Sequence, residues 1–319
     1  MQFVIRRLFV LALSASICYA ANAQNASRIY VEPDGWSIGT DFGKTDLLAS
    51  VGPQSWSNLY TNSQYLKHPV FMGGMFGRYS VHPCFAVRLM VNYGTVYATD
   101  QTCKDLALKD ATKSNEYYIA YARDQTAKSN ILDNAVVFEL MPKRFNPESS
   151  RAGKRGQYYF AAGASVFHFQ PYSTVGNSNT WVRTYDLHLE GEGWGRGYPP
   201  NYSRWNWTYF YGLGYKWDIG KHLNLGFECM FHKTHTSYLD GMGESNYVDP
   251  KAYYVHLSPE NAALAMQIDD KHYILGLEPQ SAPGSSRGLT PSGSTHYVDG
   301  FLSYSITFYY KINASSRWW

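Results

Sequence analysis

The chain has 319 residues, of which 17% are aromatic, 17% are charged and 27 are glycine, and its mean hydropathy is −0.37. The charged fraction lies below the roughly 25% of an ordinary soluble domain, and abundant aromatic residues favour strands. The hydropathy excludes a polytopic helical membrane protein, and the hydrophobic content of 45% excludes a disordered chain. With 28 basic and 25 acidic residues, the chain has no charge excess that would indicate a nucleic-acid partner.

The first residues have the features of a signal peptide. Arg6 and Arg7 precede an apolar run, and Ala-Asn-Ala at 21–23 matches the small-residue pattern of a cleavage site. We expect residues 1–23 to be removed, which leaves 26 basic and 25 acidic residues, and residues 24–319 to form one barrel domain. A lipoprotein signal ending at Cys18 is the alternative, although an isoleucine precedes it where a small residue is expected.

Eight stretches of the mature chain alternate between apolar and polar positions, and each has about the length of a tilted membrane strand. The clearest runs from 205 to 218, where every odd position up to 217 is Trp, Tyr or Leu and Trp stands at both ends. Such a row is typical of a lipid-facing strand with aromatic girdles. In chain order, the eight stretches are 36–42, 70–79, 85–97, 131–141, 158–169, 205–218, 223–232 and 297–310.

The links between these stretches alternate in length. Those at 81–84 and 218–222 are short and that at 143–157 is moderate, whereas long links occupy 44–68, 98–130, 170–204 and 234–295. This alternation is the pattern of outer-membrane barrels. We therefore predict an all-β fold, an eight-stranded antiparallel transmembrane β-barrel of the cell outer membrane, with short periplasmic turns, long extracellular loops and both termini in the periplasm.

Four charged residues fall on the inward face by the parity of their strands: Arg88, Glu139, Lys216 and Glu228. Eight strands leave an interior that side chains can fill, so a general porin is disfavoured. Charges confined in that interior need partners. We expect a salt-bridged plug, with a selective ion path as the alternative.

Catalytic and metal-binding patterns are weak. The chain has no Gly-x-Ser-x-Gly or Cys-x-x-Cys sequence, and Thr-His-Thr-Ser at 234–237 has no placed acid beside it. His232 and His235 stand at a strand end, where the helical spacing of a metal site is absent, so we interpret them as interfacial residues. We expect neither an enzyme nor a cofactor. A lipid-modifying barrel enzyme is the alternative.

The barrel topology separates the three mature cysteines. Cys84 falls in a periplasmic turn, Cys103 in an external loop and Cys229 on the lipid face, and a disulfide cannot span the two ends of a barrel. Cys84 is therefore a candidate for an intermolecular disulfide, with a buried thiol at the rim as the alternative. One periplasmic turn is basic and is either a docking patch for an acidic partner or a solvated turn. Its basic residues are Lys143, Arg144, Arg151, Lys154 and Arg155.

Several blocks of sequence resemble the PorG family of outer-membrane β-barrels from the type IX secretion machinery. They are Phe-His-Phe-Gln-Pro at 167–171, Leu-Glu-Gly-Glu-Gly at 189–193, Thr-Ser-Tyr-Leu-Asp-Gly at 236–241, Tyr-Val-Asp at 247–249 and Arg-Gly at 287–288. The resemblance covers most of the mature chain, and the Tyr-Leu-Asp block with the trailing Tyr-Val-Asp is its most specific part. The chain departs from the family at Gly241, where a second acid is usual, and at Gln170, where Asn is commoner.

The resemblance implies a non-enzymatic component that associates with the periplasmic ring of the proteins PorK and PorN and is required for secretion of cargo. Docking from the periplasm would use the turns, so Cys84 and the basic turn are our candidates for partner binding. Two other classes stay open. One is a structural or adhesive barrel of the OmpA/OmpX kind, and the other is the lipid-modifying enzyme.

Overall fold

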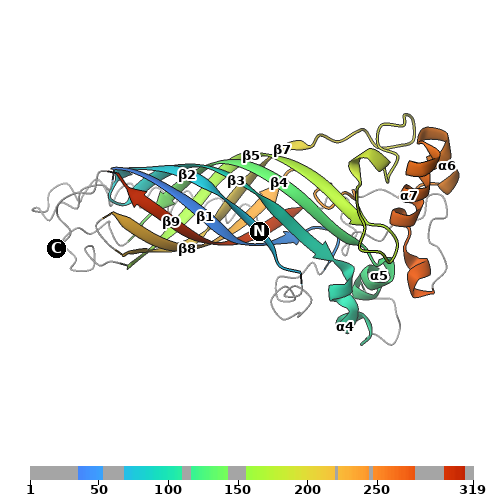
Figure 1. The fold of residues 1–319 in the computed structure, drawn as a ribbon, viewed down its shortest axis with the longest axis horizontal. Helices are drawn as coiled ribbons and strands as arrows, with labels where there is room; N and C mark the ends of the chain where they lie inside the picture. The colour runs from blue at the N-terminus through green and yellow to red at the C-terminus, as the bar shows by residue number, and fades with distance from the viewer. Residues whose placement is uncertain are drawn as a thin grey trace, which may run out of the picture.

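The computed structural model describes residues 35–52, 68–109, 116–142, 156–219, 222–243, 247–276 and 298–312. Eight long strands form a closed antiparallel barrel in which β1 pairs with β9 (Figure 1). This confirms the predicted fold, and each predicted strand corresponds to one observed strand. They are β1 (Gly35–Leu48), β2 (Val70–His82), β3 (Phe85–Thr99), β4 (Thr126–Leu140), β5 (Gly156–Thr174), β7 (Trp205–Asp218), β8 (Leu223–Thr234) and β9 (Gly300–Lys311).

Alternation along each strand sorts the side chains between an apolar outer face and a filled interior. In β7, Trp205, Tyr211 and Trp217 are each more than half exposed, whereas their neighbours Phe210 and Lys216 are buried. A continuous outer face of exposed aromatic and aliphatic residues is the lipid-facing belt of a membrane barrel. The barrel therefore spans a membrane with its strands. No described helix has the length and hydropathy to cross a bilayer.

At one end, the strands run further than the alternation predicts. β4 begins at Thr126 rather than at 131, and β5 continues to Thr174 rather than stopping at 169. The last residues of β3, from Tyr97 to Thr99, are all buried, so both faces of the sheet are covered there. In β4 and β5 the burial still alternates at these ends, but outward positions carry polar residues such as Lys128, Asn130 and Gln170, so the contrast in hydropathy that marks a strand is absent from the sequence.

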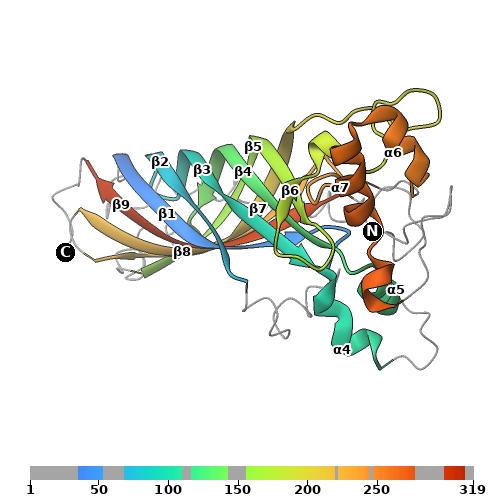
Figure 2. The ribbon, with the colours of Figure 1, turned by 45° about the vertical axis from the view of Figure 1, so that its right-hand side comes forward.

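The long links fold into a helical structure at that same end, which we call the cap (described residues 47–52, 99–126, 171–204, 235–276 and 298–299) (Figures 1 and 2). From the sequence alone, these links are predicted only as loops. Their elements are η2 (Asp100–Cys103), α4 (Lys104–Ala107), α5 (Glu116–Arg123), β6 (Trp181–Arg183), η4 (Tyr185–Leu187), α6 (Pro250–His256), α7 (Pro259–Asp269) and η5 (His272–Leu275).

Local sequence explains where α6 and α7, the two helices of the last long link, begin. Asp249 caps α6 by accepting a hydrogen bond from the backbone N–H of Lys251 at 2.9 Å, and Ser258 caps α7 in the same way. A proline follows each cap residue at the first helical position, where its missing N–H costs nothing. The buried face of α7 then packs on the cap core, whose buried members are Leu187, Leu189, Val248, Tyr253, Ala262, Ala265 and Ile268.

A second apolar cluster joins the cap to the barrel. Phe167 and Phe169 of β5 are fully buried and pack with Leu239 and Met242 of the cap and with Ile131 of β4. Burial of large apolar side chains of this kind contributes about 1.5–3 kcal/mol each. The cap is thus attached to the barrel by a continuous core, and the links described at the other end of the barrel are short turns.

Candidate functional site

A layer of paired charges crosses the barrel interior. The Arg88 guanidinium donates two hydrogen bonds to the Glu228 carboxylate, at 2.6 and 2.9 Å, and its Nε lies 3.6 Å from Glu139 Oε1. Arg78 Nε donates to Glu139 Oε2 at 2.8 Å, and the Tyr159 hydroxyl donates to Glu228. The four charged side chains are at most 3% exposed. We call Arg78, Arg88, Glu139, Tyr159 and Glu228 the ion layer.

The ion layer unites three of the four inward charges named from the sequence. Lys216 is also buried, within electrostatic range of Glu139 and 6.0 Å from the Tyr159 ring. Arg78 and Tyr159 were missed, although alternation along β2 and β5 would have placed both inside. A narrow lumen filled by bidentate and shared ion pairs opposes free passage of solutes, because separating buried partners is costly.

A second charged network holds the cap. Asp100 is fully buried and accepts hydrogen bonds from Arg123 Nε at 2.9 Å and from the backbone N–H groups of Gly52 and Gln125. Arg123 donates further to the carbonyl of Ser50 at 2.8 Å. Although burial by itself would lower the pKa of the Arg123 guanidinium, the Asp100 carboxylate raises it. This pair ties the first long link to the second.

Asp240 extends this network to the last long link. Its carboxylate accepts from the Ser50 hydroxyl at 2.6 Å and from the backbone N–H of Met242 at 2.9 Å, and its side chain is fully buried. Burial raises the pKa of Asp240 to about 6, against the lowering effect of these hydrogen bonds and of Arg123. Burial also lowers the pKa of Lys271 to about 8, and its ammonium donates to the Thr174 hydroxyl at 3.0 Å.

Four blocks that carry the family resemblance meet in the cap. Tyr238 donates from its hydroxyl to Glu190 Oε2 at 3.1 Å, and its ring stacks on Tyr202 with centroids 4.1 Å apart. Leu239 packs on the phenylalanines of the 167–171 block, and the last residue of the 247–249 block caps α6. The remaining block, at 287–288, lies outside the described residues, as does the expected signal peptide.

The candidate docking residues lie at the opposite end or outside the described ranges. Cys84 stands in the turn after β2 and is 5% exposed, with its Sγ 2.8 Å from His82 Nδ1. Its carbonyl accepts from the backbone N–H of Met141. Cys103 is in the cap and Cys229 is in the wall, so the structure keeps the three cysteines apart. The five basic residues of the 143–157 turn fall outside the described residues.

The two histidines singled out from the sequence face different environments. His232 points into the lumen, stacks on Phe301 at 4.1 Å and lies 3.1 Å from the Ser303 hydroxyl, so its interpretation as an interfacial residue is wrong. His235 stacks on the lipid-facing Trp207 at 3.6 Å. Opposite faces of the wall separate them. Within the described ranges, no group of three His, Cys, Asp or Glu side chains has the arrangement of a metal site.

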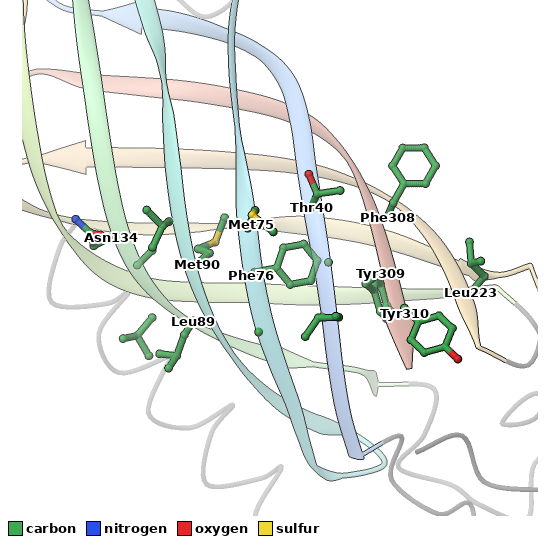
Figure 3. A pocket seen from close by; sticks show the side chains of 16 residues that line it. Thr40, Met75, Phe76, Leu89, Met90, Asn134, Leu223, Phe308, Tyr309 and Tyr310 are labelled. Carbon is green, nitrogen blue, oxygen red and sulfur yellow. The ribbon is translucent and has the colours of Figure 1, made fainter. Parts of the chain in front are cut away.

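An apolar depression of about 860 Å³ lies on the barrel wall (Figure 3). Its lining comes from β1 to β4, β8 and β9 and includes Met75, Leu89, Phe308 and Tyr310, all exposed on the belt. Gly77 of β2 contributes to the hollow because it presents no side chain to the outer face. The hollow is thus an apolar feature of the lipid-facing surface.

Comparisons with known proteins give limited similarity. No protein-family description matches the chain, and no curated protein sequence matches it. Among solved structures, Neisserial surface protein A (NspA) is similar with a TM-score of 0.35 and 8% identity, over 88% of this chain and all of that chain. OprG from Pseudomonas aeruginosa gives 0.34 and 10%, over 89% and 100%, and the N-terminal barrel domain of OprF from the same species gives 0.30 and 9%, over 86% and 96%. Similarity at this level carries no argument about function.

Proposed function

We propose that this protein is a non-enzymatic outer-membrane anchor of the type IX secretion machinery, which docks on the PorK/PorN ring through its short turns. The observation that carries this proposal is that four PorG-like blocks contact one another at the cap end, through two apolar clusters and the hydrogen bond from Tyr238 to Glu190. Blocks that are far apart in the sequence and yet contact one another form a structural unit. Their shared location supports a real family relationship rather than scattered chance matches.

The filled lumen supports an anchor rather than a channel. Bidentate pairing of Arg88 with Glu228 and the sharing of Glu139 by two arginines occupy the interior with side chains. An anchor needs a rigid wall and a surface for its partner, and neither needs an open path.

Charge on the outer face supports the assigned orientation. Three lysines stand on the outer face of described strands, Lys44, Lys128 and Lys233, and all three are near the cap. Lys128 lies 4.2 Å from the centroid of the Trp181 ring, and the wall at the short-turn end shows aromatic side chains such as Trp36 and Trp217. Lysines beside aromatic residues suit a leaflet with phosphate-bearing headgroups. In our proposal the cap lies outside the cell and the short turns lie in the periplasm, and the lysines near the cap support this orientation.

The proposal is tested by gentle extraction of the tagged full-length protein from its native outer membrane and identification of its co-purifying proteins. We expect PorK and PorN to be recovered. Neutralising Arg151, Lys154 and Arg155 together should reduce that recovery at least tenfold, whereas neutralising Lys104 and Lys109 in the cap is the matched control and should not. A barrel that purifies without ring proteins would contradict the secretion role.

The same experiment with and without reductant tests Cys84. Loss of ring proteins on reduction, and in Cys84→Ser, would support an intermolecular disulfide. Because Cys84 is buried against His82 and the Met141 backbone, a disulfide there would require the turn to open. Unchanged recovery in both conditions would remove Cys84 from the docking surface and leave the basic turn.

The second candidate function is that of a structural or adhesive barrel of the OmpA/OmpX kind. The specific observation in its favour is the folded cap, which presents helices α4 to α7 at the end opposite the turns. Deletion of the genomic copy separates the two functions. Loss of secretion of cargo bearing C-terminal sorting domains supports the secretion anchor, and intact secretion with altered adhesion supports the alternative.

A further inference from the structure

We infer that the barrel lumen holds one small monovalent cation between the ion layer and the cap. The site is built by Asp41 of β1, Asn92 of β3 and Asp133 of β4, and it is independent of the secretion role. Neither aspartate belongs to the ion layer, and neither makes a salt bridge with a described cation.

The three side chains lie along one line across neighbouring strands. Asp41 pairs in register with Gly74 of β2, Gly74 with Asn92, and Asn92 with Asp133. Asn92 Nδ2 donates to Asp41 Oδ2 at 3.2 Å, crossing over Gly74. A β-carbon at Gly74 would lie 2.0 Å from Asn92 Oδ1, so glycine is required there for the amide to reach Asp41.

Oxygen atoms with no hydrogen-bond partner converge on a cavity at this line. The cavity has a volume of about 20 Å³ and is lined by Asp41, Asn92 and Asp133, with Glu228 and His232 also in its wall. Asp41 Oδ1, Asn92 Oδ1 and Asp133 Oδ1 are all buried without a partner among the described residues. A space of this size admits one water-sized particle. Three acceptors around it favour a cation, because no described group donates a hydrogen bond to these three oxygen atoms, although the Ser165 hydroxyl lies near Asp133.

The charge balance of the lumen indicates a single positive charge. The inward side chains of the described strands comprise five acids, Asp41, Asp133, Glu139, Asp218 and Glu228, and four bases, Arg78, Arg88, Lys216 and Lys311. Lys311 pairs with Asp218 at 3.2 Å, and the other bases belong to the ion layer or lie beside it. With His232 neutral, the lumen has a net charge of −1. One monovalent cation at the two free carboxylates neutralises it, whereas a divalent ion would reverse the sign.

Hard oxygen ligands of this kind suit an alkali ion, and we choose Na⁺ as the probe because of the small cavity. The full-length mature protein is refolded from urea into detergent, so that the site forms in the presence of the ion and no entry path is needed. Refolding is done in NaCl or in N-methylglucamine chloride at equal ionic strength. The readouts are the thermal midpoint of the barrel on unheated gels and the sodium retained after gel filtration.

We expect about one sodium retained per barrel and a midpoint about 2–4 °C higher in NaCl than in N-methylglucamine chloride. Asp133→Asn and, independently, Asp41→Asn should abolish both differences. Asp186→Asn, an exposed acid-to-amide change in the cap, is the matched control and should retain both.

Three results would overturn the proposal. The first is no retained sodium and equal midpoints in the two salts. The second is a sodium effect that survives both lumen variants, which would place the ion elsewhere. The third is stabilisation by acid in place of sodium, which would mean that Asp41 and Asp133 share a proton near Glu228, His232 and Arg88. Retention of calcium in preference to sodium would likewise overturn the monovalent assignment.

Discussion

The barrel interior and the cap both contain buried ion pairs between arginine and a carboxylate. In the interior these residues lie on strands, whereas in the cap they lie in a long link. In the interior, Arg88 and Glu228 come from strands whose alternation fixes the direction of each side chain. In the cap, Arg123 and Asp100 come from the same long link. Asp100 directly follows the end of β3, and Arg123 is the last residue of α5. The paired strands of the wall hold the ion pairs of the interior in position. In the cap, the ion pair itself helps to hold the link in its conformation. The cap should therefore depend more locally on its charges than the barrel does.

The largest expected effect comes from removing an arginine from the ion layer. Arg88→Ala leaves Glu228 and Glu139 buried with fewer partners, and breaking a buried pair in this way costs about 3–5 kcal/mol. We expect a lower urea midpoint for the whole barrel, measured by tryptophan fluorescence in detergent. The double variant Arg88→Met with Glu228→Leu should recover most of the loss, because both charges are then gone. If it were as unstable as the single variant, packing rather than charge would explain the effect.

Asp100→Ala should cost a similar free energy, but it should destabilise the cap and not the whole barrel. It leaves Arg123 buried without its carboxylate and removes acceptors from Gly52 and Gln125. We expect the cap to become sensitive to protease while the barrel still shifts on unheated gels. Asp186→Asn again serves as the control. Global unfolding in place of local cleavage would show that the cap and the barrel are one cooperative unit.

The pH dependence of the cap follows from Asp240. Its folded pKa of about 6 lies above the ordinary value of 3.8, so its contribution to stability is present below pH 4 and is lost as the pH rises through 6. A shift of this size corresponds to at most about 3 kcal/mol. Protease cleavage of the cap should accelerate between pH 4 and 6 and then level off. Asp240→Asn should remove that dependence, and its persistence would assign it to another group.

The smallest expected effect is at the start of α7. Ser258→Ala removes the side-chain acceptor for the N–H of Asn261, and loss of such a cap typically costs about 1 kcal/mol. We expect a roughly fivefold faster hydrogen exchange in α7, measured by mass spectrometry, with no change in the strands. Ser258→Asp should restore protection. Equal exchange in Ser258→Ala and the unmodified protein would mean that packing on the cap core alone holds α7.

Alternation by itself predicted the eight strands, their order and the inward position of Arg88, Glu139, Lys216 and Glu228. A two-residue period is visible within a single strand and does not depend on which strands lie beside it. The same rule would have given Arg78 and Asp133, which were not singled out. It could not find the strand ends of β4 and β5, because polar residues at outward positions there, such as Lys128 and Gln170, remove the contrast in hydropathy between the two faces.

Only the tertiary structure decided which charges meet and what the long links form. Nothing in the spacing of Asp100, Arg123 and Asp240 connects them. Asp240 lies in the last long link and joins this network only because closure of the barrel brings that link beside the first one. The line of Asp41, Asn92 and Asp133 likewise depends on strand register and on Gly74 between them. The sequence by itself determined which face of the wall each strand residue occupies, through steric alternation. Contacts between strands and between loops were set by register and closure, which no single segment encodes.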